Sequence, residues 1–129
     1  MTSHSIEGKV VLIAGGAKNL GGLIARDLAQ QGAKAVAIQA DLTTAAAVEK
    51  LFADAIAAVG KPDIAINTVG KVLKKPITEI SEAEYDEMSA VNAKTAFFFI
   101  KEAGKHVNDN GKVLTLDWFE ELMDAHLKA

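Results

Sequence analysis

The sequence predicts a three-layer α/β/α domain built on a four-stranded parallel sheet with strand order 2-1-3-4. Four short apolar runs alternate with four longer segments of helical periodicity. A glycine-rich bend connects the first run to the first helical segment. Strands that alternate with helices form parallel sheets covered on both faces, and right-handed crossovers then give this order. The chain has 129 residues, the usual size of one domain, so we expect a single domain over residues 1–129.

The strands are expected where short apolar runs are bounded by turn residues. These runs are 9–14, 35–38, 63–67 and 112–116. In the order 2-1-3-4 the runs 35–38 and 112–116 are the two edges of the sheet, where unpaired backbone groups invite pairing with another chain.

The first two helices have clear start and stop signals. Residues 20–31 place Leu23, Ile24 and Leu28 on one apolar face, and Gly32 suits the C-cap. Thr43 or Thr44 is expected to cap the second helix, which Gly60 ends.

The later helical segments are longer or closer to the end of the chain. Ser81 and Glu84 fit a capping box at the start of a segment that reaches Val107, with a bend expected near Asn92. Asp117 is expected to cap a last helix. Its apolar face would carry Trp118, Leu122, Met123 and either His126 or Leu127.

Composition excludes several classes of function. A net charge of −3 gives no basic surface for nucleic acid, and no apolar run approaches the ~20 residues of a membrane span. With no cysteine there are no disulfides or thiolate metal sites, and the three histidines lack metal-ligand spacing. We therefore expect a cytoplasmic protein with no nucleic-acid, membrane or metal partner.

The bend "AGGAKNLGG", residues 14–22, is the strongest functional signal. It leaves a strand and enters a helix, where free backbone N–H groups and the helix dipole favour a phosphate. Glycines that only let the strand and helix pack tightly are the plain alternative. A phospho-receiver domain of this size would need acidic residues where Ala14, Gly15 and Asn67 stand. An FMN site would need a hydroxyl-rich loop, so that alternative is weak.

Four motifs in register resemble the short-chain dehydrogenase/reductase family. They are the glycine loop, "ADL" at 40–42, "NTVG" at 67–70 and "VNAKTAFF" at 91–98. The resemblance covers roughly residues 8 to 116 and implies a Rossmann-like fold of flavodoxin-like size. It also implies that NAD or NADP binds at the carboxyl edge of the sheet. The cofactor-binding residues implied by the resemblance are Gly15, Lys18, Asn19, Leu20, Gly21, Asp41, Leu42, Asn67, Thr68, Gly70 and Val91.

The resemblance leaves the choice of cofactor open. Lys18 stands where a basic residue in this family often favours the 2′-phosphate of NADP. A helix-strand unit before "ADL" is missing, so two strands have merged at residues 35–38. Asp41 would then lie beside the ribose instead of adenine, where it would favour NAD.

The catalytic residues of the family are largely absent. Of its asparagine, serine and YxxxK pair, only Asn92 has a match, because Tyr85 is the only tyrosine and Ser89 stands where the lysine would be. We therefore expect a catalytically inactive minimal scaffold derived from such a reductase, with residual, weak or absent NAD(P) binding. The alternatives are a functional NAD(P)-binding module, or an oxidoreductase that a partner chain completes. An engineered shortening is expected, with a natural truncated pseudoenzyme as its alternative.

Three consecutive aromatic residues suggest a possible partner. One helix face cannot bury Phe97, Phe98 and Phe99 together, and in this family the long helix often forms a subunit interface. A homodimer through Phe97–Phe99, or through an exposed sheet edge, is therefore expected.

Overall fold

The sheet has four parallel strands in the order β2-β1-β3-β4, as the sequence predicts. The computed structural model describes residues 6–15, 20–70 and 75–115. The strands are β1 (Val10–Ala14), β2 (Lys34–Ile38), β3 (Ile64–Asn67) and β4 (Lys112–Thr115). Strands β2 and β4 are the edges, as expected.

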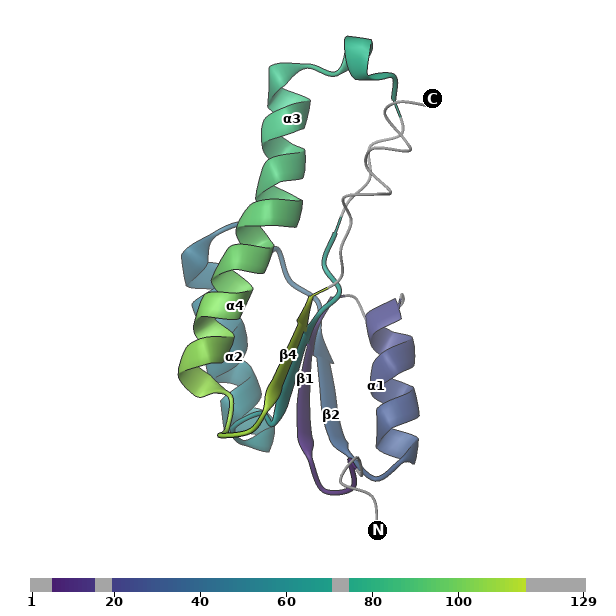
Figure 1. Ribbon diagram of the computed structural model, residues 1–129, viewed down its shortest axis with the longest axis vertical. Coiled ribbons are helices and arrows are strands. Elements are labelled where there is room, and N and C mark those ends of the chain that lie inside the picture. Colours follow the sequence, from purple (N-terminus) through teal and green to yellow (C-terminus); the bar gives the residue numbers. More distant parts are fainter. Residues whose placement is uncertain (1–5, 16–19, 71–74, 116–129) are drawn as a thin grey trace.

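Helices lie on both faces of the sheet and complete three layers (Figure 1). Helix α1 (Leu20–Gln30) packs on one face, and α2 (Ala45–Val59) and α4 (Thr95–His106) lie on the other. The right-handed crossover rule explains this division, because the chain moves one way from β1 to β2 and the other way from β2 to β3 and β4.

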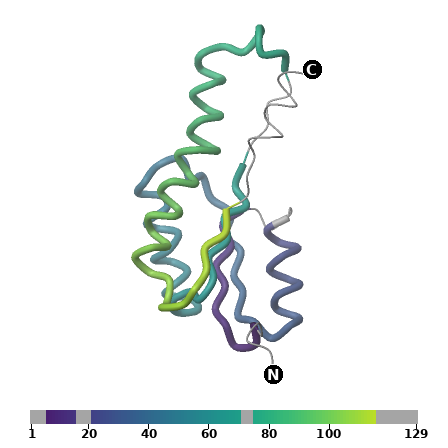
Figure 2. The backbone as a smooth tube through the Cα atoms, in the orientation of Figure 1, coloured from purple at the N-terminus to yellow at the C-terminus, as the bar shows by residue number. Residues whose placement is uncertain are grey.

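The longest helical segment is interrupted at its middle by a π-helical turn. Helix α3 (Glu82–Ser89) begins at a capping box between Ser81 and Glu84, and the π-helical turn Ala90–Lys94 leads into α4. Figure 2 shows one helical path from α3 to α4, with α3 projecting beyond the sheet. The π-helical turn contains Asn92, where the sequence predicted a bend. A short 3₁₀ turn, Ile77–Glu79, precedes α3 and was not predicted.

Two glycines and one threonine end or begin helices as expected. The Thr44 hydroxyl accepts a hydrogen bond from Ala47 N at 3.2 Å, so Thr44 and not Thr43 is the N-cap of α2. Gly32 and Gly60 both have φ of 92°, which suits the residue that follows a helix.

One apolar residue was assigned to the wrong environment. Leu23 was expected on the buried face of α1, but it is 60% exposed. Helix α1 contacts the sheet through Ile24, Ala25 and Leu28, which centres the buried face one residue further along. The expected last helix, from Asp117, lies outside the described residues.

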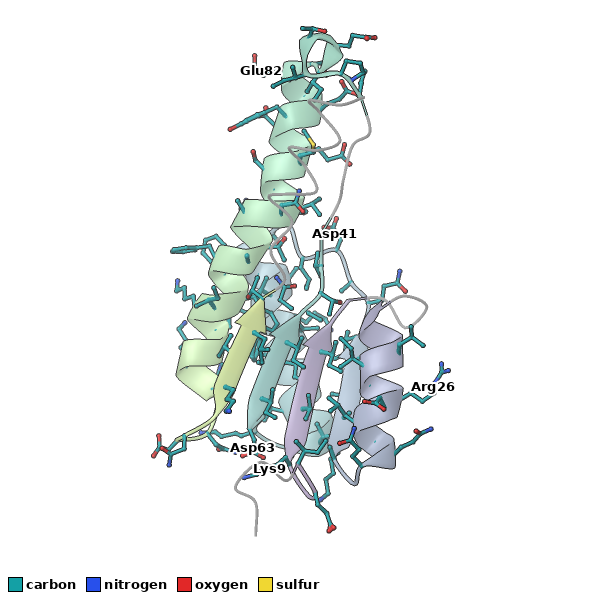
Figure 3. The ribbon with its side chains drawn as sticks, turned by 45° about the vertical axis from the view of Figure 1, so that its right-hand side comes forward. Lys9, Arg26, Asp41, Asp63 and Glu82 are labelled. Carbon is teal, nitrogen blue, oxygen red and sulfur yellow. The ribbon has the colours of Figure 1, made fainter. Side chains whose placement is uncertain are left out.

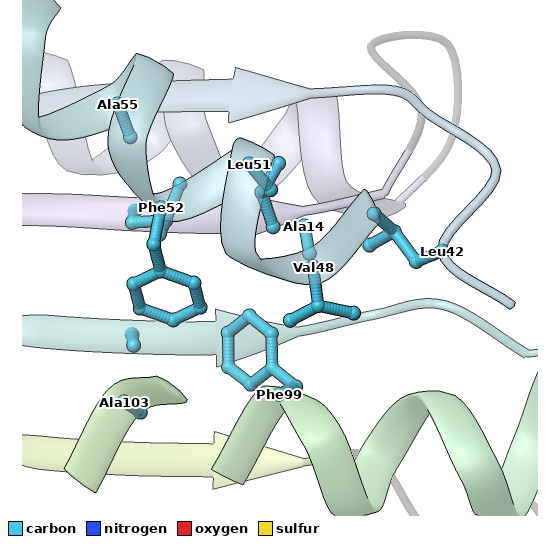
Figure 4. Close-up of a cluster of buried hydrophobic side chains, with 10 residues drawn as sticks. Ala14, Leu42, Val48, Leu51, Phe52, Ala55, Phe99 and Ala103 are labelled. Atoms are coloured by element: carbon cyan, nitrogen blue, oxygen red, sulfur yellow. The ribbon is translucent and has the colours of Figure 1, made fainter. Parts of the chain in front are cut away.

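The main core lies between the sheet and the pair α2 and α4. Phe52 and Phe99 are fully buried there, with ring centroids 5.2 Å apart. Figure 4 shows them with Leu42, which reaches this core from the loop after β2. The three phenylalanines of α4 divide as expected: Phe99 is buried, Phe98 half-buried and Phe97 64% exposed.

Asp63 fastens the amino edge of the sheet, opposite the carboxyl ends. Its Oδ2 accepts a hydrogen bond from Val10 N at 2.9 Å, and its Oδ1 accepts one from Asn108 Nδ2 at 3.0 Å. The Val10 N–H, the Asn108 amide and nearby Lys9 hold the pKa of Asp63 below its usual range (Figure 3). One carboxylate thus connects the starts of β1 and β3 to the turn before β4.

We predict that Asp63→Ala lowers the free energy of unfolding at pH 7 by about 1–3 kcal/mol, because it removes charge-assisted hydrogen bonds. Since folding lowers this pKa, the contribution is present above the unfolded value of about 4 and is lost as the pH falls through the lower folded value. Urea unfolding of both proteins at pH 7 and in acid should therefore show a difference that shrinks in acid. Asp54→Ala, which breaks an exposed helix pair with Lys50, is the control and should cost under about 0.5 kcal/mol. A cost at Asp63 no larger than this would contradict the prediction.

Candidate cofactor site at the carboxyl edge of the sheet

The carboxyl ends of β1, β2 and β3 meet because the strands are parallel and in register. Ala14 is the register partner of both Ile38 and Asn67. Gly15 follows β1 directly, and its N–H donates to the Ile38 carbonyl at 3.0 Å. Ligands of open parallel sheets bind outside the carboxyl ends, where neighbouring strands connect in opposite directions. Here that position is between β1 and β3.

Gly15 and Thr68 approach each other too closely for any side chain at position 15. The Thr68 hydroxyl and backbone N–H both donate to the Ala14 carbonyl, each at 2.8 Å. A Cβ on Gly15 would overlap the Thr68 hydroxyl, and the φ of Gly15 is 137°, which L-residues rarely adopt. A glycine is therefore required at this point of the loop.

Asn67 is a buried polar side chain at this edge. It is 1% exposed, and its Oδ1 accepts from Val69 N at 3.0 Å, which shapes the loop 67–70. Its Nδ2 has no hydrogen-bond partner, and neither has the buried hydroxyl of Thr115, its register partner on β4. Buried polar groups are seldom left without partners, so these two atoms mark a polar place at the end of β3 and β4.

Asp41 and Leu42 point in different directions. Asp41 is exposed above the carboxyl ends (Figure 3), and its Oδ1 accepts from the Thr43 hydroxyl at 2.7 Å and from Thr43 N at 3.1 Å. These two hydrogen bonds, the hydroxyl first, lower the pKa of Asp41. The Leu42 side chain is 2% exposed and packs in the core, so only its backbone faces the loop.

Thr95 connects the Asp41–Leu42 loop to the π-helical turn, and the sequence gave no sign of this role. It is fully buried, and its hydroxyl lies 2.8 Å from the Leu42 carbonyl and 3.0 Å from the Ala90 carbonyl. Val91, half-buried in the same turn, is thereby kept close to this loop. A buried threonine at a helical position looks like any small core residue until the tertiary contact is known.

The predicted site residues thus fall into three groups. Gly15, Asn67 and Thr68 are in direct contact or register, and Gly70 and Val91 lie on the adjoining segments. Leu20 and Gly21 begin α1, and Gly21 is buried. Lys18 and Asn19 lie outside the described residues.

Two negative findings apply to the described part of the chain. Within residues 6–15, 20–70 and 75–115, no cluster of three or more histidine, aspartate or glutamate residues could hold a metal ion. No helix in those ranges has both the length and the apolar character needed to cross a bilayer. Tyr85, the only tyrosine, lies on the projecting helix α3 and is 53% exposed.

The family comparison matches nearly the whole chain. Residues 4–125 match the model described as enoyl-(acyl carrier protein) reductase. The chain is 29% identical to elsinochrome reductase 1 of Elsinoe fawcettii over 141 residues, which cover 90% of the chain and 53% of that reductase. It is 30% identical to the hydroxynaphthalene reductase-like protein Arp2 of Metarhizium brunneum, covering 89% of the chain and 52% of Arp2. The chain spans about half the length of these curated relatives.

Solved structures share the fold at higher identity. A putative dehydrogenase from Burkholderia cenocepacia with bound NADP has a TM-score of 0.81 and 60% identity, over 88% of this chain and 54% of that one. A blue fluorescent protein from a metagenomic library, in complex with NADPH, has a TM-score of 0.77 and 26% identity, over 87% and 56%.

We predict that Gly15→Ala destabilises the protein by at least about 1–3 kcal/mol, because the backbone conformation is strained and the new methyl group overlaps Thr68. Urea unfolding measures the change. Gly104→Ala is the matched control, since a Cβ there meets nothing within 4 Å, and on helix α4 it should stabilise by about 0.5–1 kcal/mol. The double variant Gly15→Ala with Thr68→Ala should recover only the part due to overlap. Equal stability of Gly15→Ala and the wild type would show that the close approach is wrong.

A second prediction concerns Thr95. Thr95→Val keeps the shape of the side chain but leaves the Leu42 carbonyl without its donor, at a cost of about 1–3 kcal/mol. Thr95→Ser keeps the hydroxyl and should lose less. Amide hydrogen exchange at residues 41–43 should speed up in the valine variant and not in the serine variant. Unchanged exchange in both would mean that Thr95 does not hold the loop.

Proposed function

Because the chain belongs to the short-chain dehydrogenase/reductase family, we propose that it binds an NAD(P) dinucleotide at the carboxyl edge of its sheet and does not by itself catalyse a reductase reaction. The close approach of Gly15 to Thr68 is the observation that carries the binding proposal. It gives backbone access at the end of the central strand, beside the first turn of α1. The 60% identical dehydrogenase with bound NADP favours binding over a bare scaffold.

The described residues fit a dinucleotide. Gly15 leaves open the space that any Cβ would fill, and the N-terminus of α1 favours a phosphate. The buried amide of Asn67 has a donor to spare at the same edge. Gly15 and Gly21 would lie along the pyrophosphate, and Asp41, Asn67 and Thr68 along the adenosine half. When bound, the nicotinamide supplies a hydride donor or acceptor.

NADP is the form that we propose is preferred. Rossmann folds that select NAD place a free carboxylate against the ribose 2′-hydroxyl. In this chain β2 ends at Ile38 and uncharged Gln39 follows, while Asp41 already accepts two hydrogen bonds from Thr43. The neighbour that carries NADP supports the same choice. Lys18, by its place in the sequence, would add positive charge for a 2′-phosphate.

The proposed lack of catalysis rests on missing acid–base groups. Carbonyl reduction needs a proton donor beside the carbonyl, and a positioned acid or base contributes about 10²–10⁴ in rate. The only tyrosine, Tyr85, is exposed on the projecting helix α3 and has no lysine four residues later. Cofactor-dependent carbonyl reduction by the purified chain would overturn this half of the proposal, and would favour an oxidoreductase completed by a second chain.

We also propose that the chain is a shortened derivative of a longer reductase, of engineered origin. The alignment with elsinochrome reductase 1 runs over 141 residues, more than the 129 of this chain, so it includes positions that this chain lacks. Loss of one helix-strand unit before Asp41 accounts for that excess. The order β2-β1-β3-β4 is uninterrupted across the join, which fits a deliberate removal of whole elements.

Self-association is a further proposal. Phe97 and Ile100 are both more than half exposed on α4, and β4 is an edge strand with Val113 and Leu114 exposed. Either surface could receive a second copy. A mass by light scattering that doubles with concentration would support the homodimer, and a monomer at every concentration would contradict it.

The binding prediction is tested by separate titrations of NADP and NAD. Calorimetry should give micromolar dissociation of NADP, about −8 kcal/mol, and weaker binding of NAD. Gly21→Asp places a carboxylate in the first turn of α1 and should abolish the NADP-induced rise in melting temperature. Gly104→Asp, the matched change on an exposed face of α4, should leave the rise intact. Melting curves without cofactor check that both variants fold, and an equal rise in both would remove the glycine loop from the account.

A further inference from the structure

The face of the sheet under α1 is only half covered by the described residues. Helix α1 packs on β2 and β1, while β3 and β4 have no helix over them on this side (Figure 3). Ile64 and Ile66 point to this face and are half-buried, and Leu114, the register partner of Ile66, is 50% exposed. We call Ile64, Ile66 and Leu114 the open face. On the opposite side α2 and α4 already cover the sheet.

We propose that the C-terminal segment, residues 116–129, folds back as an amphipathic helix over the open face and completes the third layer. The segment lies outside the described residues, and the proposal rests on its sequence and on where β4 ends. From Asp117 the apolar residues Trp118, Leu122 and Met123 recur at helical spacing, with acidic residues between them and Lys128 near the end.

Length and connectivity select this occupant. A helix over residues 117–128 is about 18 Å long at about 1.5 Å per residue, enough to cross strands of about 13 Å. The segment begins one residue after Thr115, at the carboxyl end of the strand that borders the open face. Because it is covalently attached there, its local concentration far exceeds that of a second copy at ordinary protein concentrations. Burying Trp118 also removes a large apolar surface from water.

Trp118 is the only tryptophan, so its fluorescence reports on the segment without any added probe. In the cofactor-free wild-type protein we expect blue-shifted emission and severalfold less quenching by acrylamide than in urea. Leu114→Asp should shift the emission to the red and restore severalfold stronger quenching. Phe97→Asp makes the same change at an exposed residue of α4, on the other side of the sheet, and should leave Trp118 unaffected.

Three results would overturn the proposal. They are a Trp118 as accessible in the native protein as in urea, equal effects of Leu114→Asp and Phe97→Asp, or no effect of Leu114→Asp. Protection that disappears on dilution, with a matching loss of dimer in light scattering, would assign the open face to a second copy and overturn it too. Far-UV circular dichroism checks folding. If Leu114→Asp does not fold, Leu122→Asp, on the segment itself, should expose Trp118 in the same way, and protection that survives that change would count against docking.

Discussion

The pairing of β1 between β2 and β3 is the constraint on which the rest of the structure depends. Val11, Leu12, Ile13 and Ala14 are fully buried, so this strand can occupy only the centre of the sheet. Its apolar side chains alternate between the two faces and require helices on both. Since all three strands run in the same direction, the end of β1 places Gly15 between Ile38 and Asn67. The candidate site is therefore a consequence of how the sheet is assembled.

The two faces of the sheet have different parts in this arrangement. The side under α2 and α4 holds the Phe52–Phe99 contact, and Thr95 attaches the Asp41–Leu42 loop to it. Packing there fixes the adenosine side of the candidate site. The side under α1 contains Val11 and Ile13 but leaves Leu114 exposed within the described residues. A chain with half the length of its relatives has lost cover mainly where later elements of a longer sheet would pack.

The sequence predicted the sheet well because strand order follows from few rules. Apolar runs located all four strands to within one residue, and the caps at Thr44, Ser81 and Gly60 follow from local chemistry. Leu23 was misplaced because a rotation of one residue on a short helix depends on what it packs against. The Asp63 and Thr95 hydrogen bonds join residues 45 to 53 positions apart, and no local pattern announces them. The glycine loop was located by its motif, but the part played by Thr68 in fixing Gly15 needed the fold.

The most direct test of the account is to locate the cofactor on the molecule. Backbone amide spectra by two-dimensional NMR, recorded during an NADP titration, should show shifts at Gly15, Asp41 and residues 67–70. The amides of Asp63 and Asn108 at the opposite edge should stay unchanged. Shifts confined to the amino edge, or none at millimolar NADP, would contradict a dinucleotide site at the carboxyl ends of β1 and β3.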